Sequence, residues 1–316
     1  MEQGSASNSG QKLEVIVAGD EGSVRLDRVL AVRLPQLSRS RLKALILDDA
    51  VTLKNAPIRD PAYHVAAGDT ITIDVPEAVA AEPAGEDIAL DIVHEDDDII
   101  VINKPIGVAA HPSVGWTGPT VLGALAGAGY TVSTSGSAER AGIVHRLDVG
   151  TTGLMVVAKS ERAYTHLKRQ FHDREVDKVY HAIVQGHPDP LTGTIDAPIG
   201  RHPKHDWKFA VTADGKPSIT HYETVEAFPS ASLLEIHLES GRTHQIRVHM
   251  AAQRHPCVGD PLYGADPTIS ARLGLTRQWL HAAQLSFTHP GSGDWVTYDA
   301  AYPSDLQHAL DVLRED

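Results

Sequence analysis

The sequence contains little that would place the protein in a membrane or in an oxidising compartment. Its 316 residues include a single cysteine, Cys257, so no intrachain disulfide and no all-cysteine metal site can form. Apolar runs such as Leu154–Ala158 are short, whereas a membrane-spanning helix needs about 18 apolar residues in succession. The first residues, MEQGSASNSGQ, lack the basic start and apolar block of a signal peptide. We therefore expect a soluble, cytoplasmic protein with no membrane partner.

Basic residues are in deficit, but the deficit is unevenly distributed. The chain has 28 Lys and Arg against 41 Asp and Glu, a formal net charge of -13. Residues 76–100 hold nine acidic and no basic residues, whereas residues 24–75 hold eight basic and six acidic ones. Residues 101–288 are also slightly basic, with 18 basic and 16 acidic residues. Two mildly basic segments therefore permit RNA binding in spite of the acidic total.

Composition and hydrophobic spacing divide the chain into four parts. Residues 1–23 are predicted to be a flexible N-terminal segment, because their start is rich in Gly, Ser, Asn and Gln. Residues 24–75 show two amphipathic helical patterns followed by short strands, which indicates a small α/β module. Residues 76–86, PEAVAAEPAGE, have the composition of a linker. Residues 87–316 form the large domain.

The large domain alternates strand patterns with few helices. Helices are expected at Glu161–His172, with Ser160 as N-cap, and at Thr243–Gln253. Because strands and helices do not alternate regularly, the pattern predicts an α+β fold with a mixed, mainly antiparallel sheet rather than a doubly wound one. The expected strands are Ile99–Asn103, Gly153–Lys159, Val179–Gln185, Ser232–Leu238 and Trp279–Phe287.

The segment richest in reactive side chains is Ala141–Lys159, AGIVHRLDVGTTGLMVVAK. His145, Arg146 and Asp148 stand just before a turn of small residues that leads into an apolar strand. Charged side chains at such a strand edge are where a ligand can approach the backbone. An Arg–Asp ion pair that merely fixes a loop is the plain alternative. The tripeptide Arg-Leu-Asp at 146–148 does not by itself decide between a ligand site and an ion pair, because Arg25–Asp27 has the same three residues in an expected surface helix.

The longer pattern HRLDxxTTGLMVVAK resembles the signature of the RNA pseudouridine synthases, specifically the ribosomal large-subunit type of the RluA/RluD group. Four other segments resemble motifs of that family and stand in the family's order. Residues 24–75 resemble an S4 RNA-binding module, with LSRSRLKALI as its basic helix. The resemblance spans nearly the whole chain and implies the pseudouridine synthase fold with an N-terminal S4 module. The four segments are Asn103–Pro112, Lys178–Ala182, Gly241–Met250 and Gly259–Gly264.

The resemblance implies a role for each residue in the candidate site. Isomerising uridine breaks the N-glycosidic bond and rejoins the uracil through C5, with no redox change, so no cofactor is expected. Asp148 would be the catalytic carboxylate, and Arg242 of the GRTHQ motif would be the cation that keeps it ionised. Tyr180 would stack on the target base. Arg146 would enter the RNA stack as the uridine is flipped out.

The same resemblance implies which residues bind RNA more generally. Arg39, Arg41 and Lys43 lie together at the start of the S4 helix, where backbone N–H groups also favour phosphate. His145 and Lys104 are expected to join them in binding RNA.

Histidines are abundant, 18 in all, but they do not indicate a metal site. His244 and His249 are five residues apart, which a helix of about 3.6 residues per turn places on different faces. No HExxH pattern occurs, and Cys257 has no adjacent base pattern, so we expect no metal and no cysteine nucleophile.

The expected substrate is a set of specific uridines in large-subunit (23S) ribosomal RNA, free or within an assembling subunit. Transfer RNA is the alternative substrate, and a non-catalytic RNA-binding or ribosome-assembly factor is the alternative class. Asp148 argues against a non-catalytic factor, because a protein that only binds RNA has no need of a carboxylate in the pocket. Val149–Gly150, where many relatives carry a charged residue, bears on substrate choice. A monomer is expected, because no long exposed apolar stripe occurs.

Overall fold

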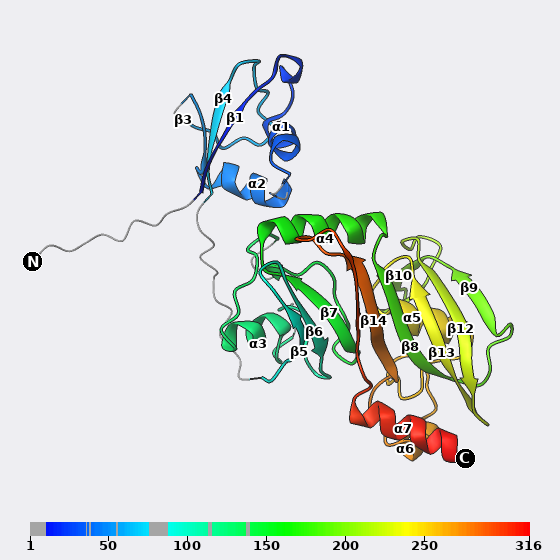
Figure 1. Cartoon of the computed structure of the whole chain (residues 1–316). Helices are drawn as coiled ribbons and strands as arrows, with labels where there is room; N and C mark the ends of the chain where they lie inside the picture. Colours follow the sequence, from blue (N-terminus) through cyan, green and yellow to red (C-terminus); the bar gives the residue numbers. More distant parts are fainter. Residues whose placement is uncertain are drawn as a thin grey trace, which may run out of the picture.

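The computed structural model describes residues 11–316 apart from positions 36, 38, 55, 76–87, 113–115 and 137–139. The predicted linker, residues 76–86, and the first ten residues of the predicted flexible segment lie outside the described residues. The described chain forms two units with separate sheets and separate hydrophobic cores (Figure 1). None of the helices formed by the described residues is long and apolar enough to cross a membrane.

The N-terminal unit is a four-stranded sheet with strand order β1-β4-β2-β3 and two helices. Its start differs from the predicted flexible segment, because Gln11–Ile16 forms a strand that pairs antiparallel with β4. This strand brings Val15 into the core beside Leu30, Leu42 and Ile73, and that burial is what orders it. The elements are β1 Gln11–Ile16, η1 Gly19–Glu21, α1 Leu26–Arg33, α2 Arg39–Leu47, β2 Val51–Leu53, β3 Ala56–Pro57 and β4 Thr70–Val75.

The large unit is built on a nine-stranded sheet with the order β5-β6-β7-β14-β8-β13-β12-β9, and β15 pairs with β14. Every neighbouring pair in it is antiparallel except β7 and β14. The predicted mixed, mainly antiparallel sheet is therefore confirmed. The strands are β5 Asp91–Glu95, β6 Ile99–Lys104, β7 Thr152–Ala158, β8 Asp177–Gln185, β9 Thr192–Asp196, β12 Ile219–Ala227, β13 Ala231–Leu238, β14 Leu280–Thr288 and β15 Trp295–Asp299, with a separate hairpin of β10 Ile199–His202 and β11 His205–Val211.

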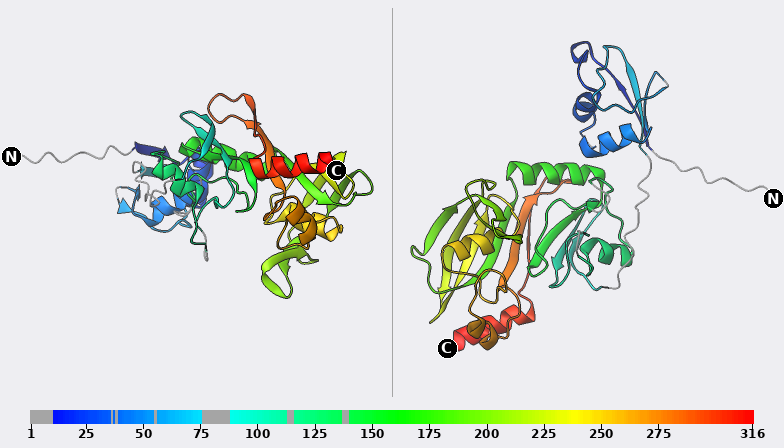
Figure 2. Two further views of the ribbon diagram at one scale, coloured as in Figure 1. Left: turned by 90° about the horizontal axis from the view of Figure 1, so that it is seen from below. Right: turned by 180° about the vertical axis from the view of Figure 1, so that it is seen from behind.

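Helices cover both faces of this sheet. On one face, α3 (Val121–Gly127) and α5 (Gln245–Ala252) pack onto a shared core. On the other, α4 (Glu161–Asp173) and α7 (Ser304–Glu315) each cover a separate cluster, and α6 (Pro267–Arg272) lies near α7. Figure 1 shows α5 behind the sheet, and the right-hand view of Figure 2 shows it in front. The middle strands are consequently buried on both sides, as all seven residues of β7 show.

The first residue of a helix is determined by its capping side chain or by the backbone conformation of the residue before it. Ser160 accepts a hydrogen bond from the backbone N–H of Ala163, so the predicted N-cap of α4 is confirmed. The second predicted helix starts later than expected, at Gln245. His244 has a φ of 57°, in the left-handed region, and therefore cannot belong to the helix.

Gly153 fixes the junction at which parallel β7 and β14 meet. Its φ is +112°, which disfavours any side chain, and it pairs with Ala282 of β14. A Cβ at this position would lie 2.3 Å from the carbonyl oxygen of Ala282 and 2.6 Å from its nitrogen. This close backbone contact fixes the position of the loop that precedes β7 relative to β14.

Replacing Gly153 by Ala should therefore lower the free energy of unfolding of the large unit by about 3 kcal/mol or more, because backbone atoms cannot yield as a flexible side chain can. Denaturant unfolding measures this. Gly241→Ala is the matched control, since nothing lies within 4 Å of a Cβ built there. Equal stability of the two variants would contradict the expectation.

Candidate active site

Asp148 lies in the loop before β7, in a pocket at the start of α5. Residues from three of the five sequence motifs line this pocket, although they are far apart along the chain. The side chain of Asp148 is 16% exposed, so water reaches it only from the open side of the pocket. The lining includes Arg146, Asp148, Tyr180, Arg242, His244 and Arg247.

The cation beside Asp148 is Arg247 of α5, whose Nη1 lies 3.3 Å from Asp148 Oδ2. Asp260 holds the same guanidinium through two hydrogen bonds, to Nε at 2.7 Å and to Nη2 at 2.9 Å. Burial lowers the pKa of Arg247, but the hydrogen bonds and charge of Asp260 and the charge of Asp148 more than offset this. The guanidinium is therefore a fixed positive charge that presents Nη1 to Asp148.

Arg242 does not occupy the position that the sequence predicted. It is exposed, and its Nε donates to the carbonyl oxygen of Pro217 at 3.3 Å, while Asp148 pairs with Arg247. The predicted pairing of Arg242 with Asp148 is thus corrected. The physical reason is position: Arg242 precedes the left-handed residue His244, whereas Arg247 lies on the inward face of α5. Arg242 remains at the rim of the pocket.

Tyr180 lies on β8 and is 8% exposed. It lines the pocket with Asp148 and also a second, adjoining cavity. Burial raises the pKa of Tyr180, and the negative charge of Asp148 raises it further. The phenol therefore keeps its proton at physiological pH, which suits a face for stacking more than a base.

The three remaining predicted residues in this unit behave differently from one another. Arg146 is exposed and lines both cavities. His145 instead accepts the backbone N–H of Val156 at 3.0 Å and stacks on Phe171 with ring centroids 4.5 Å apart. Burial, with the charges of nearby lysines, lowers the pKa of His145 to about 3, so it is a neutral residue engaged by the protein itself.

Lys104, expected to bind RNA, is fully buried. Its ammonium donates to the carbonyl oxygens of Pro105 and Val108, both at 2.9 Å, so the predicted RNA contact is corrected. Burial lowers the pKa of Lys104 to about 7, against the opposing charge of Asp148. The side chain anchors the loop after β6 close to Asp148.

The S4 residues are described only in part. Arg39, Arg41 and Lys43 all belong to α2, as predicted, and Lys43 is exposed. The side chains of Arg39 and Arg41 lie outside the described part of the structure, as does Ser38.

Three residues of the site carry no role in the sequence-based prediction: Arg247, Asp260 and His244. His244 Nε2 lies 3.8 Å from Asp148 Oδ2. Arg247 stands between Ile246 and Val248 in an expected helix, and a charge among apolar neighbours is a signal of a paired, buried ion. Nothing in the spacing shows that Asp260 is its partner.

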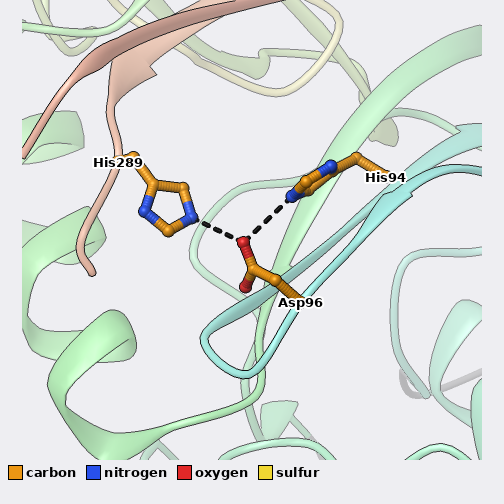
Figure 3. Close-up of side chains that lie close together, drawn as sticks. All are labelled: His94, Asp96 and His289. Atoms are coloured by element: carbon orange, nitrogen blue, oxygen red, sulfur yellow. Dashed lines mark hydrogen bonds and ion pairs between the residues drawn. The ribbon is translucent and has the colours of Figure 1, made fainter. Parts of the chain in front are cut away.

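One group of His and carboxylate side chains in the described residues is compact enough to hold a metal ion: His94, Asp96 and His289 (Figure 3). Both imidazole Nε2 atoms lie against Asp96 Oδ2, at 2.9 and 2.8 Å. His289 Nδ1 accepts backbone N–H groups from Gly291 and Ser292 at 3.1 Å each. The neutral ring must therefore carry its proton on Nε2 and donate it to Asp96, which leaves no lone pair there for a metal. The three side chains therefore form hydrogen bonds that join the turn after β5 to the turn after β14.

Both units of the chain are similar to known proteins. The family model for RNA pseudouridylate synthase matches residues 98–252, and that for the S4 domain matches residues 24–71. The chain is 59% identical to an uncharacterized RNA pseudouridine synthase of Mycobacterium bovis, over 92% of this chain and 94% of that protein. It is 42% identical to ribosomal large subunit pseudouridine synthase D of Escherichia coli K12, over 96% and 95% of the two chains.

A solved structure shows the same relationship. The human RNA pseudouridylate synthase domain containing 1 matches with a TM-score of 0.55 and 28% identity, over 69% of this chain and 86% of that one. Together with the sequence relatives, this shows that the chain belongs to the RNA pseudouridylate synthase family and carries an S4 domain. It is an RNA-modifying isomerase, as its motifs predicted.

The buried position of Lys104 makes a prediction about stability. Between its ordinary pKa of 10.5 and the folded value of about 7, the unfolded chain binds a proton that the folded chain does not. The free energy of unfolding should therefore fall by a few kcal/mol as the pH falls from about 10.5 to 7, and then level off.

Lys104→Met should lose this dependence, so that the variant gains stability relative to the wild type as the pH falls from 10 to 7. Guanidinium unfolding at several pH values measures it. Lys216→Met, at an exposed position, is the control. A difference between wild type and Lys104→Met that stays constant with pH would contradict the buried, deprotonating lysine.

Proposed function

We propose that this protein converts specific uridines of large-subunit ribosomal RNA to pseudouridine, with Asp148 as the catalytic carboxylate. The observation that carries the proposal is the pairing of Asp148 with a buried arginine in a pocket that Tyr180 and Arg146 also line. The pairing holds the carboxylate in one orientation beside a fixed positive charge, which suits either direct attack on the nucleoside or proton removal. The reaction needs no redox partner, because the glycosidic C–N bond is exchanged for a C–C bond and the C5 hydrogen leaves as a proton.

The substrate class rests on the relatives. Ribosomal large subunit pseudouridine synthase D of Escherichia coli and that of Zymomonas mobilis align over more than nine-tenths of this chain. Transfer RNA stays the alternative substrate. We further propose that the protein acts as a monomer in the cytoplasm.

Tyr180 and Arg146 take complementary roles in the proposal. A buried, protonated tyrosine beside Asp148 offers the extruded uracil a flat surface. Arg146 is exposed at the mouth of the same pocket, and its planar guanidinium can replace the extruded base in the RNA stack.

A cavity of about 510 Å³ beside the pocket supports binding of the RNA backbone. In the described chain, its lining includes five cations that form no ion pair with a carboxylate. Burial lowers the pKa of Lys168, and the charge of Arg140 adds to this. Burial likewise lowers the pKa of Lys178. Cations without a carboxylate partner among the described residues favour an anionic ligand, and phosphates passing Tyr180 would supply it. The five are Arg140, Arg146, Lys168, Lys178 and Arg242.

Asp148→Asn should abolish pseudouridine formation, with a loss of at least about 10³-fold in rate. RNA affinity should change little, because asparagine keeps the shape of the side chain. Tritium release from ribosomal RNA labelled at C5 of uridine measures the rate, and filter binding measures the affinity. Asp97→Asn, on the exposed turn before β6, is the control. Activity of Asp148→Asn within tenfold of the wild type would refute the catalytic role.

Carbodiimide mapping of RNA from cells with and without the protein identifies the substrate. Lost sites in large-subunit ribosomal RNA support the proposal, and sites lost only from transfer RNA move the same chemistry to the alternative substrate. Two results together would favour the assembly-factor alternative. Deletion of the protein would remove no modified site, and Asp148→Asn would support normal subunit assembly in cells that depend on the protein.

The basic cavity makes a separate prediction about binding. Lys168→Glu should weaken RNA binding and make the salt dependence of log Kd shallower by about one unit, because one phosphate contact is lost. Arg169→Glu is a matched control, since it reverses a charge one residue further along α4 but outside the cavity lining. Salt titrations of binding compare the two variants. Equal effects would show that only overall charge matters.

A further inference from the structure

His244 lies at the centre of a short chain of contacts that ends at Asp148. Its Nδ1 lies 2.7 Å from the hydroxyl of Tyr263, and its Nε2 faces Asp148 Oδ2 at 3.8 Å. The ring is held edge-on by Tyr263 and by Phe209 of β11, with centroids 5.6 and 5.7 Å away. The backbone of His244 is also constrained, because its φ of 57° lies in the left-handed region, which residues other than glycine rarely adopt.

The hydrogen bonds determine which nitrogen of His244 carries the proton. The backbone N–H of Phe209 donates to the Tyr263 hydroxyl oxygen at 3.2 Å. The hydroxyl hydrogen of Tyr263 needs an acceptor of its own. Within the described chain, the acceptor placed against it is His244 Nδ1. Neutral His244 then carries its hydrogen on Nε2, the atom that faces Asp148.

We infer that Tyr263 fixes His244 as the Nε2–H tautomer, and that His244 thereby acts as a positioning residue for Asp148. This inference rests on the proposed function, in which Asp148 is the catalytic carboxylate. Arg247 and His244 both face the same oxygen, Oδ2, at 3.3 and 3.8 Å. Arg247 donates a hydrogen bond to this oxygen, and the Nε2–H of His244, which lies beyond hydrogen-bond distance, turns its positive end toward it. Together they favour one rotation of the carboxylate and leave Oδ1 for the nucleoside.

The surroundings keep His244 neutral, as this role requires. Burial lowers the pKa of His244, and the charges of Arg247 and Arg146 lower it further, against the opposing charges of Asp148 and Asp260. A neutral ring donates only through the nitrogen that holds its proton. The tautomer therefore decides whether Nε2 supports Asp148 or presents a lone pair to it.

Tyr263→Phe tests the inference, because it removes the hydroxyl but keeps the ring over Arg247, whose Cζ lies 5.0 Å from the ring centroid. Without the hydroxyl, the proton of neutral His244 distributes between the two nitrogens. Protonation of the ring restores an N–H on Nε2. The variant should therefore be slower than the wild type by about threefold at pH 8 and by less at pH 6 in single turnover, with RNA affinity unchanged.

The ratio of variant to wild-type rates is the decisive quantity, because other titrations cancel in it. A ratio that is the same at pH 6 and pH 8 would overturn the inference and leave Tyr263 a merely structural role. Tyr222→Phe is the matched control, since it also removes one buried hydroxyl hydrogen bond, to Pro190, away from Asp148. That variant should show no pH-dependent ratio.

Replacing His244 supplies a second test. His244→Gln keeps an N–H group near the position of Nε2 and should retain more activity than His244→Leu. In the His244→Gln background, Tyr263→Phe should cause no pH-dependent loss, because glutamine does not titrate. A pH-dependent loss that persists in the double variant would overturn the inference. Thermal melts exclude unfolding as the cause in each case.

A measurement without substrate separates this inference from the proposed function. Long-range ¹⁵N–¹H correlation spectra of the full-length protein report the tautomer of each histidine. His244 should be the Nε2–H form in the wild type and a mixture in Tyr263→Phe. An Nδ1–H form in the wild type would refute the inference whatever RNA the enzyme modifies. A correct tautomer in a protein inactive on ribosomal RNA would instead refute only the proposed substrate.

Discussion

The candidate active site depends on a buried arginine that serves two carboxylates. A guanidinium taken out of water must be fully paired, and Asp260 meets most of that requirement for Arg247 through two short hydrogen bonds. Its Nη1 is then directed at Asp148 by a side chain that these bonds hold in place. Asp260 also accepts the backbone N–H groups of Leu262 and Tyr263, so the loop that carries it is tied to the same charge. The segments around Asp148, Arg247 and Asp260 are thus joined electrostatically, although none is adjacent to another in sequence.

The two faces of the large sheet contribute differently to the stability of the site. The face that α3 and α5 cover holds the site, since Tyr180, Leu147 and Ile246 share its core. The opposite face is closed by α4 and α7 over separate apolar clusters. Lys104 and Gly153 act at the ends of the neighbouring strands, one by binding two carbonyl groups and the other by admitting the backbone of β14. The loop bearing Asp148 is consequently fixed from several sides before any RNA binds.

Much of this could be predicted from the sequence, and the failures have physical causes. The strands and α4 follow from apolar spacing and from Ser160, which are local signals. The family motifs predicted the pocket around Asp148. They could not show which of two arginines, five residues apart in one motif, faces the carboxylate, because that depends on where the helix begins. His244 decides this by its left-handed backbone. The burial of Lys104 and the strand at Gln11–Ile16 were missed because each depends on partners distant in sequence.

The order of strands has a consequence for how the enzyme matures. β14, residues Leu280–Thr288, lies between β7 and β8, so these two strands join one sheet only when β14 pairs with both. A chain emerging from the ribosome therefore carries Asp148 and Tyr180 long before it can seat them in one sheet. Contacts between such distant segments form late and slowly. The unfinished sheet exposes the edges of β7 and β8 until then, and an enzyme of this topology gains its activity only after Leu280–Thr288 has been synthesised.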